Sequence, residues 1–307
     1  MQRKGYLRIL FGALAAASAA HAGTIFLSSA SDGTIGAYTT SGVTINASLV
    51  TGLTDPESLT LSGSNLFVEL DGTTVGEYTT SGGTVNSTLI TGLGNVHQIS
   101  SFGSDLFVSN GNPTNTIGEY TTSGTAVNSA LISGVDVAHG AASNGTDIFV
   151  LNNDNGASGT GFISEYTTSG VLVNSSLITG LSSPEEILIL GSDIYVTNFL
   201  TGTVGEYTTS GGTVNASLIT GLNGPIGIAT DGTNLYIANA EGGTVSEYTT
   251  SGAVVNSSLI TGLDEPVGIA VVPTTTPEPS SFGLAAGALV ALGLWRRRRP
   301  QTRSTHT

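Results

Sequence analysis

Four side chains of types that bind divalent metals occupy the same position of a repeated sequence unit. They are Glu57, His97, His139 and Glu185, each at the second residue of a short segment that is otherwise mostly small or apolar. Neutral imidazoles and carboxylates bind zinc and similar ions, and a catalytic zinc keeps one position open for water. The four residues are therefore a candidate site for zinc or calcium. The alternative is a polar, water-lined opening in which the histidines make ordinary hydrogen bonds.

The same position holds apolar residues in the two other units, Ile226 and Val267. The next position adds Gln98 and Glu186, whereas serine or glycine stands there elsewhere. The loops that follow are lengthened in two units only, at 111–115 and 153–160, and these units carry the histidines. Function often resides in such loops on a rigid scaffold. The departures from the repeat therefore gather in one region.

The repeat is set by the sequence Tyr-Thr-Thr-Ser-Gly, which occurs six times at intervals of about forty residues. Its tyrosines are Tyr38, Tyr78, Tyr120, Tyr166, Tyr207 and Tyr248. The unit at 225–260 divides into four segments rich in β-branched or aromatic residues, separated by turns such as Asp231-Gly232. Four strands at this period predict one blade of a β-propeller. The tyrosines recur in every unit, so we expect them to pack the scaffold.

The phase of the two ends predicts how the ring closes. The segment at 24–29 matches the second strand of the unit, and the segment at 266–272 matches the first. We therefore expect an all-β, six-bladed propeller at 23–273, with one blade built from both ends. Such closure removes free sheet edges. Five Asn-x-Ser/Thr sequons fall on the fourth strand, where we expect scaffold residues and not glycan acceptors: Asn46, Asn86, Asn174, Asn215 and Asn256.

The units resemble the NHL repeat. Its Pro-x-Gly-Ile-Ala, Leu-Tyr-Ile-Ala-Asn and Val-x-x-Tyr elements stand at 225–229, 235–239 and 245–248, and the resemblance covers about residues 24–272. The basic residues usual near the third strand of that repeat are missing, so an RNA-binding role does not carry over. By position alone, the His/Glu cluster also resembles the channel mouth of six-bladed lyases and gluconolactonases. A third histidine and a basic substrate-holding residue are lacking here.

Charge excludes a nucleic-acid partner. The formal net charge is −14, and all eight Lys and Arg residues lie at the two ends of the chain. Every Asp and Glu except Glu278 lies between Gly23 and Pro273, so nothing there neutralises phosphates. There is no cysteine, so the domain depends on packing and not on disulfides. We also find no Gly-x-Ser-x-Gly elbow or other nucleophile motif.

The first 22 residues have the pattern of a secretory signal peptide. Arg3 and Lys4 precede an apolar run at 7–20, and Ala20-His21-Ala22 is a small-x-small cleavage site. We predict cleavage after Ala22.

The other end resembles the PEP-CTERM sorting signal of Gram-negative bacteria. Pro277-Glu278-Pro279 lies in a linker at 274–281, an apolar transmembrane helix is expected at 282–295, and a basic tail follows at 296–307. The arginines of the tail are Arg296, Arg297, Arg298 and Arg299. They are expected to stay cytoplasmic by the positive-inside rule. The apolar run is shorter than the roughly 20 residues of a comfortable span, which suits transient insertion in the inner membrane. The resemblance implies recognition by an exosortase and release to the cell surface or matrix.

These features predict an exported, surface-sorted propeller that acts as a non-enzymatic binding or structural module. The resemblance of the tail implies an exopolysaccharide or biofilm context, with polysaccharide or a surface protein as partner. The alternative is a metal-dependent lyase or lactonase-type hydrolase that uses the His/Glu cluster. The near identity of the units favours the module, and the paired histidines favour the enzyme.

Overall fold

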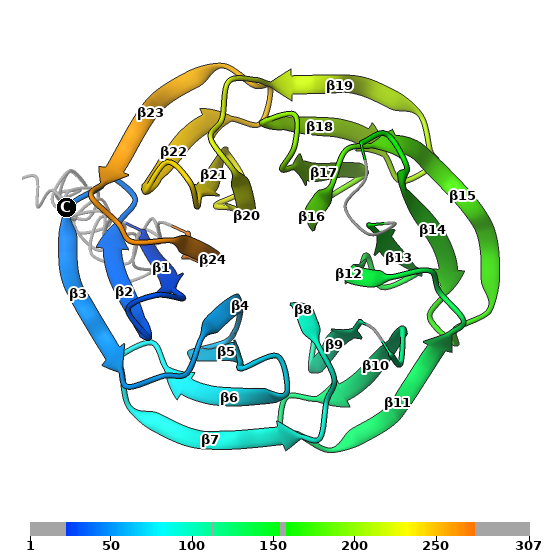
Figure 1. Cartoon of the computed structure of the whole chain (residues 1–307), viewed down its shortest axis with the longest axis horizontal. Coiled ribbons are helices and arrows are strands. Elements are labelled where there is room, and N and C mark those ends of the chain that lie inside the picture. The colour runs from blue at the N-terminus through cyan, green and yellow to red at the C-terminus, as the bar shows by residue number, and fades with distance from the viewer. Residues whose placement is uncertain (1–22, 112, 154–157, 274–307) are drawn as a thin grey trace, which may run out of the picture. The chain divides into compact units, whose positions relative to one another are not determined.

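A computed structural model describes residues 23–111, 113–153 and 158–273, which form a six-bladed β-propeller (Figure 1). Each blade is a four-stranded antiparallel sheet, and no helix occurs in these residues. From the channel outward, blade 1 is β24 (Pro266–Val272), β1 (Thr24–Ser29), β2 (Thr34–Thr39) and β3 (Thr44–Thr51). Blade 2 is β4 (Pro56–Ser62), β5 (Asn65–Leu70), β6 (Thr74–Thr79) and β7 (Thr84–Thr91).

Four further blades repeat this order. Blade 3 is β8 (Val96–Phe102), β9 (Asp105–Asn110), β10 (Thr116–Thr121) and β11 (Ala126–Ser133). Blade 4 is β12 (Ala138–Ser143), β13 (Asp147–Asn152), β14 (Gly161–Thr167) and β15 (Leu172–Leu181). Blade 5 is β16 (Pro184–Leu190), β17 (Asp193–Asn198), β18 (Thr203–Thr208) and β19 (Thr213–Ile219). Blade 6 is β20 (Pro225–Thr230), β21 (Asn234–Asn239), β22 (Thr244–Thr249) and β23 (Val254–Thr261).

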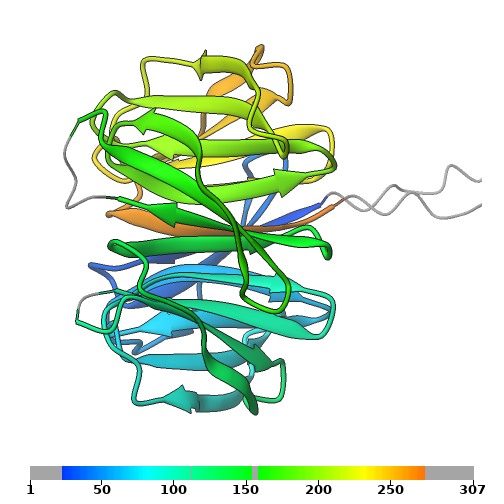
Figure 2. The same ribbon diagram turned by 90° about the vertical axis from the view of Figure 1, so that its right-hand side faces the viewer.

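Blade 1 closes the ring with strands from both ends of the described chain. β24 pairs with β1 in antiparallel register, with Thr24 opposite Val272 and Ser29 opposite Pro266. The predicted closure is therefore confirmed. Both strands cross the propeller from one face to the other (Figure 2). Thr24 and Val272 consequently lie at one face, and Ser29 and Pro266 lie at the other.

The apolar core consists of six clusters, each formed between two neighbouring blades. One of them joins Phe26 and Ile35 of blade 1 to Leu66 and Val68 of blade 2. Burying both faces of each sheet in this way stabilises the ring through the hydrophobic effect. Because no blade has a core of its own, a blade depends on its neighbours.

The repeated tyrosines are packing residues, as the repeat predicts. Tyr38 and Tyr78 are buried, and Tyr166 is half-buried against the cluster between blades 3 and 4. Glycine precedes four of the tyrosines by two positions, and a Cβ placed at Gly36 would lie 2.7 Å from the Tyr38 ring. The ring thus folds back over its own strand, which explains the Gly-x-Tyr spacing.

The outermost strand of each blade is exposed and carries a bulge. In blade 2 the register of β6 with β7 shifts on both sides of the Glu77–Asn86 pair. At this point Asn86 Oδ1 accepts a hydrogen bond from the Thr88 N–H at 3.1 Å. The same bond forms in all six blades, including that of Asn128 to Ala130 N, where the sequence is not a sequon. The repeated asparagine therefore stabilises the bulge.

The predicted signal peptide, the Pro-Glu-Pro linker, the transmembrane segment and the basic tail lie outside the described residues. Within the propeller, there is no helix of the length and hydropathy needed to cross a membrane.

Candidate functional site at the channel mouth

A residue in the left-handed backbone conformation precedes every innermost strand and sets the direction in which the strand enters the channel. These residues have φ between 42° and 65°: Asp55, Asn95, Val137, Ser183, Gly224 and Glu265. Positive φ is uncommon outside glycine and rare for a β-branched residue such as Val137. Its occurrence in all six blades shows that the ring requires this turn at the mouth.

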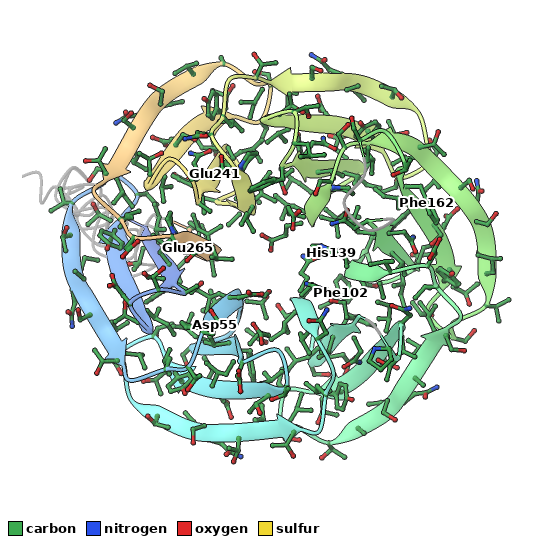
Figure 3. All side chains as sticks on the ribbon, in the orientation of Figure 1. Asp55, Phe102, His139, Phe162, Glu241 and Glu265 are labelled. Carbon is green, nitrogen blue, oxygen red and sulfur yellow. The ribbon has the colours of Figure 1, made fainter. Side chains whose placement is uncertain are left out.

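The column of residues that the sequence singled out lines one cavity of 400 Å³ at this mouth. Its members are Glu57, His97, His139, Glu185, Ile226 and Val267. Following the order of the blades in Figure 1, Glu57 of blade 2 lies across the channel from Glu185 of blade 5. The histidines of blades 3 and 4 lie across from Ile226 and Val267. Within this column, one side is therefore polar and the opposite side is apolar, and Figure 3 shows His139 pointing toward the centre of the ring.

The two imidazoles stack face to face. Their ring centroids are 4.2 Å apart and their planes differ by 15°. His97 Nε2 lies 2.9 Å from the Asn95 side-chain amide, which donates to it, and His139 Nδ1 lies 3.1 Å from the Glu185 backbone oxygen. Burial lowers the pKa of both imidazoles to about 4, and in His97 the neighbouring His139 contributes to this shift. Both rings are therefore neutral at pH 7, the form that stacks without charge repulsion.

The pKa values of the carboxyl groups around the histidines shift in the opposite direction. Burial raises the pKa of Glu57 to about 7, with a further contribution from the charges of Asp55 and Glu185. Burial likewise raises the pKa of Glu185 to about 7, although hydrogen bonds from Ser183 and Asn153 oppose the shift. Desolvation disfavours the charged form of both acids and bases. Near neutral pH the mouth is thus only partly ionised, in spite of its acidic composition.

A polar bridge crosses the channel beneath the mouth. The Gln98 amide nitrogen donates to Glu186 Oε1 at 3.4 Å and to the Ile187 backbone oxygen at 3.1 Å. Glu186 Oε2 accepts from the Ile228 N–H at 2.8 Å. The bridge links blade 3 to blades 5 and 6 and passes in front of Gly140 of blade 4, where a Cβ would collide with Gln98 Oε1. Gln98 and Glu186 line both the mouth cavity and a second cavity of 270 Å³ below it.

Glu69 is a functional candidate that the sequence argument missed. Its side chain is fully buried in β5, where Oε1 accepts from the Gly72 N–H and Oε2 has no partner. Burial, together with the charge of Glu57, raises its pKa to about 8. Hydroxyls stand at the equivalent position in alternate blades, where Ser28 and Ser109 bond the next blade. This break in the repeat is visible in the sequence, on the second strand of the unit and not in the column of Glu57 and His97.

The asparagines at the ends of the second strands do not line the mouth cavity. Asn152 and Asn239 are buried, and their amide nitrogens donate to Ser164 Oγ and Ser246 Oγ of the neighbouring strand. They belong to the scaffold. The described ends of the two long loops do reach the mouth, because Gly111 and Asn153 donate backbone hydrogen bonds to Asn95 and Val137.

The fit of a metal ion can be tested on this geometry. Among the residues that the structure describes, no three His, Asp or Glu side chains come together closely enough to hold one. His139 Nε2 and Glu185 Oε2 are 3.5 Å apart, and the imidazoles face each other instead of pointing to a common centre. In this arrangement the side chains do not provide the geometry of a metal site. The metal site at Glu57, His97, His139 and Glu185 therefore stays a prediction.

Comparison with known proteins identifies the fold alone. No protein-family model matches the sequence, and no curated protein aligns with it significantly. A chain in a crystal structure of a nidogen/laminin complex superposes with a TM-score of 0.67 and 14% identity, covering 81% of this chain and 98% of its own. The WD40 β-propeller domain of Doa1 superposes with a TM-score of 0.50 and 13% identity, and the match covers 74% of this chain and 76% of that chain. A streptogramin B lyase structure superposes with a TM-score of 0.48 and 19% identity, and the match covers 72% of this chain and 70% of that chain.

Proposed function

We propose that the chain is an exported, surface-sorted β-propeller that acts as a non-enzymatic binding module and holds its ligand at the channel mouth. One observation carries the proposal. Among the described residues of the propeller, charged, imidazole and apolar side chains replace one another between blades only in the column that lines the 400 Å³ mouth cavity. Small-molecule sites are concave, with a few polar groups among apolar ones.

The proposed role at a surface rests on the sorting pattern that the sequence shows at its C-terminal end. The PEP-CTERM resemblance of 274–307 adds an exosortase as processing partner, and the NHL-like repeat adds no RNA-binding role.

A second candidate is a lyase or hydrolase at the same mouth, and the neutral histidine pair favours it. A neutral imidazole can accept a proton in general base catalysis. His97 Nε2 accepts from Asn95, while His139 Nε2 faces Glu185. Substrate turnover that His139→Ala abolishes would support this candidate over the binding module.

Two measurements test the main proposal. In the producing bacterium, Glu278→Ala should retain the protein in the membrane fraction, and normal surface release of this variant would refute the sorting step. The purified protein should co-sediment with the exopolysaccharide of the same cells. Glu57→Gln with Glu185→Gln should reduce co-sedimentation. Asp105→Asn with Asp193→Asn, at the far ends of β9 and β17, is the control with two acid-to-amide changes away from the mouth. Equal sedimentation of both double variants and wild type would count against a ligand site at the mouth.

A further inference from the structure

The blades differ at the end of their second strand, and blade 1 has the smallest residue there. Asparagine stands at this position in blades 3 to 6 and Leu70 in blade 2, whereas blade 1 has Ser29. A cavity of 360 Å³ opens at Ser29, and Thr34, Gly36 and Tyr38 of the adjacent strand β2 contribute to its lining. A small residue in place of a larger one leaves such a space, because the surrounding structure relaxes only partly.

Larger side chains fill the equivalent space in other blades. In blade 2, a Cβ placed at Gly76 would lie 3.1 Å from Leu70 Cδ1. In blade 5, the carboxamide of Asn198 occupies the space and makes two hydrogen bonds. Its Oδ1 accepts from the Ser182 N–H at 3.0 Å, and its Nδ2 donates to the Val196 backbone oxygen at 3.4 Å. The backbone around this position therefore offers one donor and one acceptor to a carboxamide.

The same two backbone positions line the cavity of blade 1. Asp264 corresponds to Ser182 and Leu27 corresponds to Val196, and both Asp264 and Leu27 belong to the lining. Ser29 does not act as the asparagine does, because its hydroxyl donates to the Asp264 backbone oxygen. Within the part of the chain that the structure describes, the Asp264 N–H donates to no acceptor. Blade 1 thus has the backbone groups that bind a carboxamide but not the side chain that carries one.

The rest of the lining suits a neutral sugar ring. Asp32 stands in a four-residue loop where blades 5 and 6 have Thr201 and Gly242, and its carboxylate can accept hydrogen bonds from hydroxyl groups. The Ser48 hydroxyl and the amphipathic ring of Tyr38 complete the polar and apolar walls. The volume falls in the range of about 300–1,000 Å³ that small-molecule sites have. The acidic lining disfavours an anion.

We propose that this cavity, beside the loop 262–264 that leads from blade 6 to blade 1, is a second ligand site that binds the acetamido group of an N-acetylated amino sugar (Figure 1). The acetamido oxygen accepts from the Asp264 N–H and its N–H donates to the Leu27 backbone oxygen, in the manner of the Asn198 carboxamide. The ring hydroxyls donate to Asp32. The site shares no lining residue with the mouth cavity, so it does not depend on the ligand proposed there.

The test uses the purified protein with N-acetylglucosamine, N-acetylgalactosamine and N-acetylmannosamine as probes. In saturation-transfer difference NMR, the acetyl methyl protons of the sugar that binds should receive the most saturation. Isothermal titration calorimetry should give that sugar an affinity at least about tenfold higher than its parent hexose, in which a hydroxyl replaces the acetamido group. The parent hexose loses both hydrogen bonds to the backbone, which accounts for a difference of this size.

Ser29→Asn is the decisive variant, because it gives blade 1 the residue of blades 3 to 6. The new carboxamide should bond the Asp264 N–H and lower sugar affinity about tenfold or more. The melting temperature should stay equal or rise, since the substitution matches the repeat. Ser64→Asn, in an exposed turn of blade 2, is the matched control and should leave affinity within about twofold. Glu57→Gln with Glu185→Gln should also leave it unchanged, which separates this site from the mouth.

Asp32→Asn provides a second variant that does not depend on how the new asparagine packs. Asp32 is exposed in its loop, so the fold should persist, and the loss of its carboxylate should weaken sugar binding about threefold. Circular dichroism would verify folding of each variant.

Four results would overturn the inference. The first is that none of the three N-acetylated sugars binds. The second is equal binding of a sugar and its parent hexose, which would show that the acetamido group is not recognised. The third is binding that both Ser29→Asn and Asp32→Asn leave unchanged. The fourth is binding that the Glu57 and Glu185 substitutions abolish and Ser29→Asn does not, which would assign the sugar to the mouth and retain only the function proposed for it.

Discussion

His139 and Glu185 contact each other twice. His139 Nδ1 lies 3.1 Å from the Glu185 backbone oxygen, and its Nε2 lies 3.5 Å from Glu185 Oε2. The first contact places the proton of the neutral ring on Nδ1, so Nε2 faces the carboxyl group as an acceptor. A protonated carboxyl fits this geometry, and an ionised one would meet the Nε2 lone pair. The raised pKa of Glu185 and the lowered pKa of His139 agree with this assignment.

The stability of the protein should decrease as pH rises from about 5 to 8. Four buried or half-buried carboxyls have a pKa raised above 4.5, to about 7 or 8, so their stabilising contribution is present at low pH and is lost as pH rises through the raised values. They are Glu57, Glu69, Glu185 and Glu186. The two histidines act oppositely, because their lowered pKa removes stability as pH falls from 6.5 to about 4.

The carboxyls outnumber the histidines, so the melting temperature should be highest near pH 5 and lower at pH 8. Differential scanning calorimetry across this range is the measurement. In His97→Ala with His139→Ala, the loss of stability below pH 5 should become smaller. A melting temperature that rises from pH 5 to 8 would contradict the assignment of buried, protonated glutamates.

The stabilising effect of Glu69→Gln should appear only at high pH. At pH 5 the amide replaces a protonated carboxyl of the same shape, so the free energy of unfolding should change little. At pH 9 the wild type carries a buried charge and the variant does not, so the variant should be more stable by roughly 1 to 4 kcal/mol. Urea denaturation at the two pH values measures the difference. Asp71→Asn, at an exposed position nearby, is the control, and equal pH dependence of both variants would disprove the buried charge.

Gly140→Ala should destabilise the propeller by about 1 to 3 kcal/mol, because the new Cβ would collide with Gln98 Oε1. Gln98→Ala removes that oxygen and should largely relieve the cost of Gly140→Ala. A double-mutant cycle measured by chemical denaturation gives the coupling energy between them. Additive effects of the two substitutions would show that the polar bridge does not pass in front of Gly140.

Asn128→Ala should lower the free energy of unfolding by about 1 kcal/mol, the value of one intramolecular hydrogen bond. Asn128 Oδ1 accepts from the Ala130 N–H at the bulge of β11. The freed edge should also increase aggregation on heating, because bulges protect exposed edge strands. Light scattering during a thermal ramp measures this, with Ser129→Ala as the neighbouring control. An unchanged stability and aggregation onset would show that the repeated asparagine has another role.

The sequence was sufficient to predict the fold because its regularity records the architecture. The period of the tyrosines gave the number of blades, and the match of 24–29 and 266–272 to the second and first strands gave the closure. A repeat unit cannot bury its apolar faces alone, so its period and phase determine how neighbours stack. The same reasoning placed Ile226 and His97 in one column of the mouth.

The arrangement of the mouth could not be predicted in the same way. The stacking of His97 on His139 and the span of Gln98 to Glu186 depend on side-chain rotamers across the channel, which no sequence period encodes. Glu265 and Asp55 reach the cavity because the left-handed turn exposes the residue before the strand. The interpretation of His97 and His139 as metal ligands assumed that neighbours in a column converge, whereas in this structure their rings are parallel.

The pairing of β24 with β1 also determines how the molecule would respond to force. A pull on Val272 away from Pro266, with the rest of the ring held, would act along the axis of β24. The hydrogen bonds between antiparallel strands are perpendicular to that axis, so the load would be shared by the whole ladder from Thr24–Val272 to Ser29–Pro266 and would shear it, without opening its bonds one at a time. Joining the two ends of the chain in one blade therefore makes β24 resist extraction from the ring along its own axis.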